Sequence, residues 1–159
     1  MNKTKLVELI RAQLEKDIVV LKEAAIATYK AATDEESKPE NEYDTRGLEA
    51  SYLAGAQAKR VSEIEELLAI YKYLEIKTFG PSDVISNTAL VETESNNKTN
   101  YFFIMSKGGG MSINLEGRTI QVITPTSPLG EALIGLKEGG VAIVETGATS
   151  REYEILSVS

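Results

Sequence analysis

The sequence contains no cysteine, no histidine and no tryptophan among its 159 residues. The absence of cysteine excludes disulfide scaffolds and thiol nucleophiles, and the absence of histidine excludes imidazole acid–base catalysis. Any metal ion must therefore be held by oxygen ligands, the ligands that Mg²⁺, Mn²⁺ and Ca²⁺ prefer. Basic residues are also few, 17 against 24 acidic ones, which argues against a surface for nonspecific nucleic-acid binding.

Long apolar runs are missing as well. The N-terminus, MNKTKLVELIRAQLEKD, has charges scattered through it and lacks the apolar core of a secretory signal. No stretch approaches the length needed to span a membrane. We therefore expect a cytoplasmic protein without a membrane partner, folded as one ordinary domain or two small ones.

Two long helices are predicted in the first half of the chain. The first is expected from Thr4 to about Thr33, with apolar residues every three or four positions at Val7, Ile10, Leu14, Ile18, Leu21, Ala25, Tyr29 and Ala32. The second is expected from about Asp44 to Leu74, with one apolar face at Leu48, Tyr52, Ala56, Val61, Ile64, Leu68 and Tyr71. Pro39 disfavours helix between them, so the pattern predicts an antiparallel hairpin about 45 Å long.

The second half has the composition of a small β domain. Short β-rich runs are separated by Gly, Asn and Pro, at Ala89–Thr93, Tyr101–Ser106, Thr119–Thr124, Val141–Thr146 and Glu152–Val158. One short helix is expected at Leu129–Leu136, with Ser127 as its cap and Pro128 as its first residue. The predicted fold class is α+β: a coiled-coil hairpin over residues 1–77, then a small antiparallel β domain with one short helix over residues 78–159.

The predicted hairpin tip is rich in carboxylates. Six acids stand within eleven residues, with Lys38 as the only base among them: Asp34, Glu35, Glu36, Glu40, Glu42 and Asp44. One interpretation is an ordinary solvated turn, in which such residues are common. The other is a site for a hard divalent cation whose shell is completed by a partner, as in two-metal phosphodiester hydrolysis. No nucleophile system for a standalone enzyme is present.

A motif near the C-terminus resembles that of a known family. The stretch Ser127-Pro128-Leu129-Gly130-Glu131-Ala132-Leu133-Ile134-Gly135, followed by Glu152-Tyr153-Glu154-Ile155-Leu156, is similar to the C-terminal domain of the GreA/GreB transcript cleavage factors. That domain is FKBP-like in the family. Family members begin with a coiled-coil hairpin whose acidic tip carries a D-x-x-E-N-x-E-Y motif, and Glu36–Tyr43 corresponds to it here. The resemblance therefore spans nearly the whole chain.

The tip departs from the family pattern because it is one residue short. Matching Glu40-Asn41 to the Glu-Asn of the motif places Ser37 where the metal-assisting Asp stands in the family. Matching Glu42-Tyr43 instead places Glu36 at that Asp and Pro39 at the Glu. The resemblance carries over Glu40, with Glu36 and Glu42 as alternates.

The resemblance implies an accessory factor rather than an enzyme. Its expected partner is RNA polymerase. The C-terminal domain would bind the polymerase while the hairpin enters the secondary channel, and the protein is expected to be a monomer. Glu36, Glu40 and Glu42 would assist cleavage of backtracked RNA, and Glu40 and Glu36 would share a Mg²⁺ ion with the polymerase; no cofactor is expected on the free protein. One alternative is a secondary-channel regulator or inhibitor that does not stimulate cleavage. A third possible function is that of a binding module with a chaperone or isomerase role. It is disfavoured because the chain has no tryptophan to form the base of a proline-binding pocket.

Overall fold

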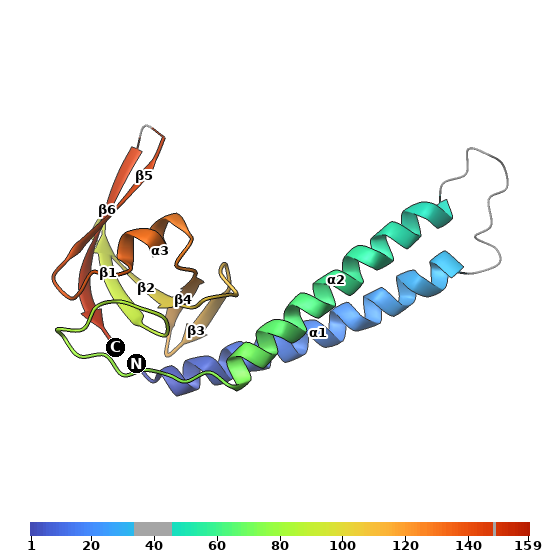
Figure 1. Ribbon diagram of the computed structural model, residues 1–159, viewed down its shortest axis with the longest axis horizontal. Coiled ribbons are helices and arrows are strands. Elements are labelled where there is room, and N and C mark those ends of the chain that lie inside the picture. The colour runs from blue at the N-terminus through green and yellow to red at the C-terminus, as the bar shows by residue number, and fades with distance from the viewer. Residues whose placement is uncertain (34–45, 148) are drawn as a thin grey trace. The chain divides into compact units, whose positions relative to one another are not determined.

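The computed structural model describes residues 1–33, 46–147 and 149–159. The chain divides into two compact units (Figure 1): Leu9–Tyr73 form one, and Met1–Glu8 together with Leu74–Ser159 form the other. The predicted domain boundary between residues 77 and 78 stays a prediction. The expected fold class, a helical hairpin followed by a small sheet domain with a short helix, is confirmed.

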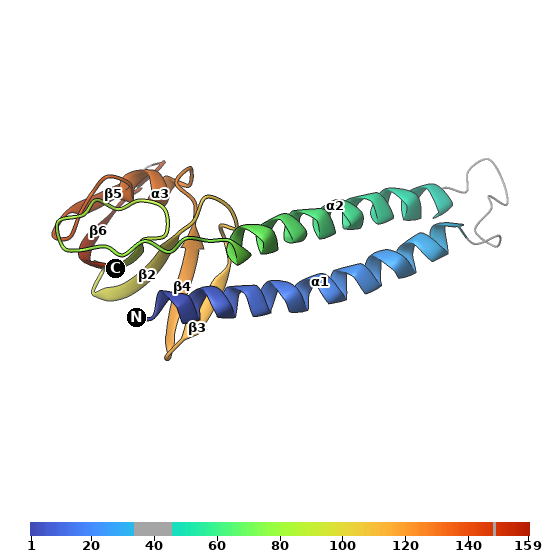
Figure 2. The ribbon, with the colours of Figure 1, turned by 60° about the horizontal axis from the view of Figure 1, so that its bottom comes forward.

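The first unit is built from helix α1 (Lys3–Thr33), apart from its residues before Leu9, and from helix α2 (Arg46–Lys72). They run side by side (Figure 2) and antiparallel: Lys22 pairs with Glu65, whereas Ala32, later in α1, shares a groove with Ser51, earlier in α2. With 31 residues, α1 is about 45 Å long. In the described residues, no helix has the length and apolarity needed to cross a membrane.

The two helices bury large apolar side chains only in the half remote from residues 34–45. Ile10, Leu14 and Ile18 of α1 and Ile64 and Tyr71 of α2 are at most 9% exposed. These residues agree with the predicted apolar faces. In the other half the prediction was wrong in part: Tyr29, Leu48 and Tyr52 are 63%, 58% and 74% exposed, and Ala56 is also exposed.

The geometry of the α-helix explains this error. Each residue turns the helix by about 100°, so every step of four residues overshoots a full turn by about 40°. Residues spaced four apart before Ile64 therefore turn progressively away from the face of α2 that contacts α1. Ala56, Tyr52 and Leu48 are such residues. The half-buried positions follow a mixture of three- and four-residue steps instead, at Val61, Gln57, Ala54 and Ala50.

The second unit contains one six-stranded sheet with the strand order β3-β4-β2-β1-β6-β5. Its strands are β1 (Leu90–Ser95), β2 (Lys98–Ile104), β3 (Ser112–Leu115), β4 (Arg118–Ile123), β5 (Val141–Thr146) and β6 (Thr149–Val158). Helix α3 (Pro128–Leu133) packs against β5. Three of the nonpolar side chains in the core beneath it are Phe102, Leu133 and Ile155, at most 4% exposed.

Two features of the sheet differ from the expectation. The strands were expected to be antiparallel, but β2 and β4 run parallel, with Tyr101 opposite Ile120, whereas the other four described pairs are antiparallel. Strand β3 was not predicted. It forms a hairpin with β4 through Glu116-Gly117, both at positive φ (56° and 77°), a geometry typical of tight two-residue turns. The run before this turn is short, so it carries little strand signal.

The first turn of α1 belongs to the sheet unit, and Lys3 joins it to that unit by hydrogen bonds. The Lys3 ammonium donates to the carbonyl oxygens of Lys77 and of Thr88, the latter at 3.1 Å, and lies 4.8 Å from the centre of the Phe79 ring. The Thr88 hydroxyl in turn accepts from the Lys77 amide at 3.0 Å. Burial lowers the pKa of Lys3 to about 8 from its usual 10.5.

This shift predicts a pH dependence of stability. Between about pH 8 and pH 10.5 the unfolded chain holds the Lys3 proton and the folded chain does not, so the contribution of Lys3 to the free energy of unfolding should rise with pH there. The measurement is urea unfolding of the wild type and of Lys3→Met, which keeps the aliphatic stem, at pH 7 to 10. The difference between the two proteins should grow in favour of the wild type. A difference that is flat or falls over this range would contradict the assignment.

Candidate functional site

The predicted site residues Glu36, Glu40 and Glu42 lie in segment 34–45, outside the described residues. Their relative placement, and the predicted Mg²⁺ site of Glu40 and Glu36, stay predictions. The residues at which this segment joins the helices are described: α1 ends at Thr33 and α2 begins at Arg46. The two helix ends therefore define the structural setting from which the candidate site residues extend along the chain.

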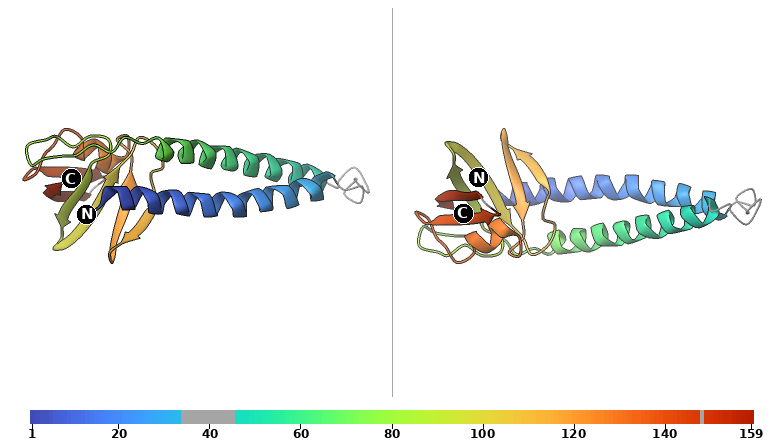
Figure 3. Two further views of the ribbon diagram at one scale, coloured as in Figure 1. Left: turned by 90° about the horizontal axis from the view of Figure 1, so that it is seen from below. Right: turned by 90° about the horizontal axis from the view of Figure 1, so that it is seen from above.

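The two helix ends lie beside each other (Figure 3). They share a surface groove of about 630 Å³, lined from α1 by residues that include Ala32 and Thr33 and from α2 by residues that include Ser51 and Ala54. The Thr33 hydroxyl donates to the Tyr29 carbonyl at 3.0 Å and so satisfies an acceptor in the last turn of α1. The acid-rich segment is consequently joined at both ends to the same end of the hairpin.

Small side chains characterise this end of the hairpin. The groove is lined mainly by Ala and by Ser51 and Gly55, and it is flanked by Ile26 and Tyr29, which are 56% and 63% exposed. Side chains of this size bury little apolar area, so the helix ends gain less from packing than the half that contains Leu14 and Ile64. The end that carries the candidate site is therefore the less strongly packed end of the hairpin.

The ion pairs of the hairpin, one between the helices and one within α2, are exposed. The Lys22 ammonium lies 2.7 Å from the Glu65 carboxylate, with both side chains about half exposed, and Arg60 lies 3.1 Å from Glu63 within α2. Exposed pairs of this kind stabilise by about 0–1 kcal/mol each. Within the described residues, no group of three or more Asp or Glu side chains is placed to hold a metal ion.

In the sheet domain, the Ser127-Pro128 motif has a structural explanation. The Ser127 hydroxyl donates to the Thr124 carbonyl at 2.7 Å and accepts from the Gly130 amide at 3.1 Å, which caps α3, and Pro128 occupies the first turn. The predicted cap is confirmed. A Cβ atom on Gly130 would lie 1.9 Å from the Thr124 carbonyl oxygen, so only glycine fits there.

A polar row across the sheet was not predicted. The Tyr101 hydroxyl donates to one Glu92 oxygen at 3.2 Å, the Ser157 hydroxyl donates to the other at 3.1 Å, and the Arg118 guanidinium lies 5.3 Å from the Tyr101 ring centre. Burial and then the charge of Glu92 raise the pKa of Tyr101, and Arg118 opposes them. No sequence signal could reveal this row, because Glu92 and Ser157 stand 65 residues apart and meet only through the pairing of β1 with β6.

Comparisons with known proteins identify the family. Residues 81–159 match the family model described as the C-terminal part of transcription elongation factor GreA/GreB. The chain is 32% identical over 134 residues to transcription elongation factor GreA of Methylococcus capsulatus, covering 84% of this chain and 78% of that protein. It is 29% identical over 154 residues to GreA of Syntrophus aciditrophicus, covering 95% and 89%.

A solved structure is also similar over most of its length. The crystal structure of GreA factor homolog 1 (Gfh1) of Thermus thermophilus matches 94% of each chain at 22% identity, with a TM-score of 0.38. The sequence match to the Methylococcus relative, together with the family model over all six strands and α3, is decisive: this chain belongs to the GreA/GreB family of transcription elongation factors.

Proposed function

We propose that this chain binds RNA polymerase, inserts the α1–α2 hairpin into the secondary channel and stimulates cleavage of backtracked RNA. The observation that supports this most is the position of the acid-rich segment. This chain belongs to the GreA/GreB family, and its segment 34–45 contains six acidic residues. The segment connects two long antiparallel helices at one end of the hairpin. A slender hairpin of about 45 Å is suited to reaching into a channel rather than to enclosing a substrate.

The carboxylates Glu40 and Glu36 are the groups proposed to hold a Mg²⁺ ion, and Glu42 is proposed to orient the attacking water by accepting a hydrogen bond from it. Carboxylate oxygens are the ligands that Mg²⁺ prefers, and the ion supplies charge stabilisation at the transferring phosphoryl group when it is bound. A protein segment alone binds such an ion weakly, because Mg²⁺ keeps several of its waters. The site is therefore proposed to be complete only when the polymerase contributes the remaining ligands.

On this proposal the chain is an accessory factor and the polymerase is the nuclease. The sheet domain contributes to binding the polymerase, and the hairpin delivers the carboxylates to the RNA 3′ end. The net charge of −7 is consistent with a protein that reaches RNA through its partner rather than by tracking phosphates itself.

A second candidate function is favoured by one observation on the tip. When Glu40-Asn41 is matched to the family motif, Ser37 takes the place of the Asp that assists the metal in the family. A serine hydroxyl carries no charge and is a weaker ligand for Mg²⁺ than a carboxylate. The alternative is therefore a protein that occupies the channel and slows nucleotide addition without stimulating cleavage.

One experiment separates the two candidates. An RNA polymerase elongation complex is stalled in a backtracked state, the full-length protein is added with Mg²⁺, and the RNA is resolved for short 3′ fragments. Release of these fragments, faster than from polymerase alone, is the result expected on the proposal. Slower nucleotide addition without fragments would favour the channel regulator. Absence of polymerase binding in a pull-down would reject both.

A further inference from the structure

Strand β5 forms one edge of the sheet. It stands last in the strand order, so one side of its backbone pairs with β6 and the other side has no neighbouring strand in the described sheet. Its register with β6 is regular from Val141, opposite Glu154, to Thr146, opposite Thr149, and contains no bulge. A regular edge of this kind presents a row of backbone N–H and C=O groups to which a further strand can be added.

The two edges of the sheet differ in how they are protected. Edge strands are normally kept from pairing with other chains by short length, charged side chains, proline or a bulge. Strand β3, at the opposite edge, has only four residues, and the side chains that it exposes, Ser112 and Asn114, are polar. Strand β5 has six residues and exposes Val141 and Ile143 by 47% and 53%. Its only charged residue is Glu145, near its end, so β5 is the edge that is open to a partner strand.

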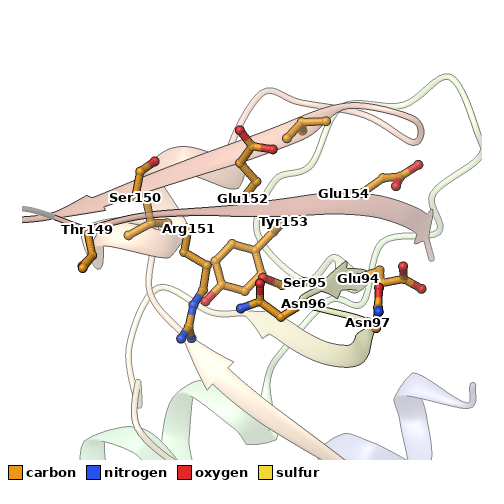
Figure 4. Close-up of a pocket in the computed structure, with 12 residues that line it drawn as sticks. Glu94, Ser95, Asn96, Asn97, Thr149, Ser150, Arg151, Glu152, Tyr153 and Glu154 are labelled. Atoms are coloured by element: carbon orange, nitrogen blue, oxygen red, sulfur yellow. The ribbon is translucent and has the colours of Figure 1, made fainter.

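Side chains at this edge alternate between a buried face and an exposed face. Ala142 of β5 lies in the core and is 1% exposed, whereas its neighbours Val141 and Ile143 are exposed. Residues that pair across two strands share a face, so Glu152 lies beside Ile143 on the exposed face. Figure 4 shows Glu152 on the side of β6 opposite Arg151 and Tyr153.

The exposed face beside this edge is acidic. Glu145 of β5, Glu152 and Glu154 of β6 and Glu94 of β1 all belong to it, and their side chains are exposed. The positions of this face on β5, β6 and β1 hold no Lys or Arg. The face therefore attracts a basic partner and repels an acidic one. A second copy of the chain, paired through the same edge, would bring the acidic faces of both copies together, which disfavours it as the occupant.

The spacing of apolar and acidic side chains suits lysine or arginine in an added strand. Neighbouring strands lie about 4.8 Å apart, so an added strand would lie roughly 10 Å from β6, with β5 between them. A long basic side chain can place its aliphatic stem over Ile143 and its charged head beside Glu152. Val141 and Glu154, which also pair across β5 and β6, form the same combination two residues along.

We propose that β5 binds an extended segment of a protein partner in which every second residue is Lys or Arg, and adds it to the sheet as a further strand. Backbone hydrogen bonds along β5 provide affinity, and the basic side chains over the acidic face provide specificity. This surface is separate from the hairpin carboxylates, so the proposal does not depend on whether the protein stimulates RNA cleavage.

The test uses the full-length ¹⁵N-labelled protein and the probe acetyl-Lys-Val-Arg-Val-Lys-Thr-Lys-amide, followed by NMR. Addition of the probe should shift the backbone amides of residues 141–146. Glu152→Gln combined with Glu154→Gln should weaken binding about tenfold, because two ion pairs are lost. The matched control combines Glu75→Gln with Glu116→Gln, which removes the same charge from exposed positions of the sheet domain outside β5 and β6. This control should bind the probe as the wild type does.

A modified probe separates strand addition from attraction by charge alone. Methylation of the backbone nitrogens of both valines keeps every charge of the probe but removes two amide donors and obstructs the strand edge, so binding should weaken at least tenfold. The proposal is overturned if the unmodified probe shifts no β5 amides, if the methylated probe binds as tightly, or if the two double variants lose the same affinity. Concentration-dependent dimers that shift the β5 amides without any probe would also overturn it, because they would assign the edge to a second copy of the chain.

Discussion

Changing Glu36, Glu40 and Glu42 together to Gln is expected to lower the rate of RNA cleavage about 100-fold while leaving polymerase binding intact. Glutamine keeps the size of each side chain but removes the negative charge that Mg²⁺ requires of its ligands. Removing one preorganised group that stabilises the transition-state charge, such as an oxyanion-hole donor, costs a factor of about 100–1,000 in rate, and we expect an effect of similar size here. Because these residues stand between α1 and α2 in the sequence, the change alters no residue of either helix or of the sheet domain.

The measurement is the rate of 3′-fragment release from a backtracked complex, with polymerase affinity determined on the same preparations. The matched control is Glu8→Gln, Glu15→Gln and Glu23→Gln together, which removes the same charge from exposed positions of α1. This control should cleave at the wild-type rate. An equal loss of cleavage rate in the two triple variants would mean that the net charge of the protein, and not the position of the tip carboxylates, determines the rate.

Single substitutions rank the three carboxylates. If Glu40-Asn41 aligns with the family motif, Glu40→Gln should lose most of the activity and Glu36→Gln little. If Glu42-Tyr43 aligns instead, Glu36 occupies the position of the motif Asp, and Glu36→Gln should lose the most. Cleavage at the wild-type rate in the triple variant would reject the tip mechanism altogether.

Gly130→Ala is expected to destabilise the sheet domain by about 3 kcal/mol, the upper end of the usual cost of overpacking. The added methyl group would lie 1.9 Å from the Thr124 carbonyl oxygen and 2.9 Å from the Ser127 hydroxyl oxygen. That carbonyl also accepts the hydrogen bond from Ser127, so it cannot withdraw without breaking the cap of α3. Replacing glycine by alanine within a helix normally raises stability. Here the close contact makes the same replacement destabilising.

Gly55→Ala is the matched control. Gly55 stands inside α2, and a Cβ atom there would meet nothing within 4 Å. The same substitution should therefore stabilise the hairpin by about 0.5–1 kcal/mol through the higher helix propensity of alanine. Urea unfolding followed on NMR signals of the sheet domain and of α2 separately reads out both variants. A neutral Gly130→Ala would show that the chain around Thr124 can relax, contrary to the expectation.

Local features of the chain could be predicted well from the sequence. The ends of α1, the positions of five of the six strands, and the cap formed by Ser127 and Pro128 depend on residues close together in the chain. Helix periodicity, the missing amide of proline and the serine cap all act within a few residues, so the sequence records them directly. The motif around α3 also led to the correct family.

The candidate site was only partly accessible to the same reasoning. The sequence located an acid-rich segment between two helices, and the structure places the flanking residues Thr33 and Arg46 at the ends of α1 and α2. The roles of Glu36, Glu40 and Glu42 rest on the family resemblance. Glu92 and Ser157 could not be paired in advance, because 65 positions of sequence separate them and each is ordinary in its own strand.

The sequence by itself therefore determined the helical hairpin, most strands, the capped helix α3, and the lack of any cysteine or histidine chemistry. Only the tertiary structure decided which side of α2 faces α1, that β2 and β4 run parallel, and that Glu92 receives hydrogen bonds from Tyr101 and Ser157. The reason is physical. Turns, caps and periodicity are local free-energy preferences, whereas strand register and helix facing depend on side chains that meet from distant parts of the chain.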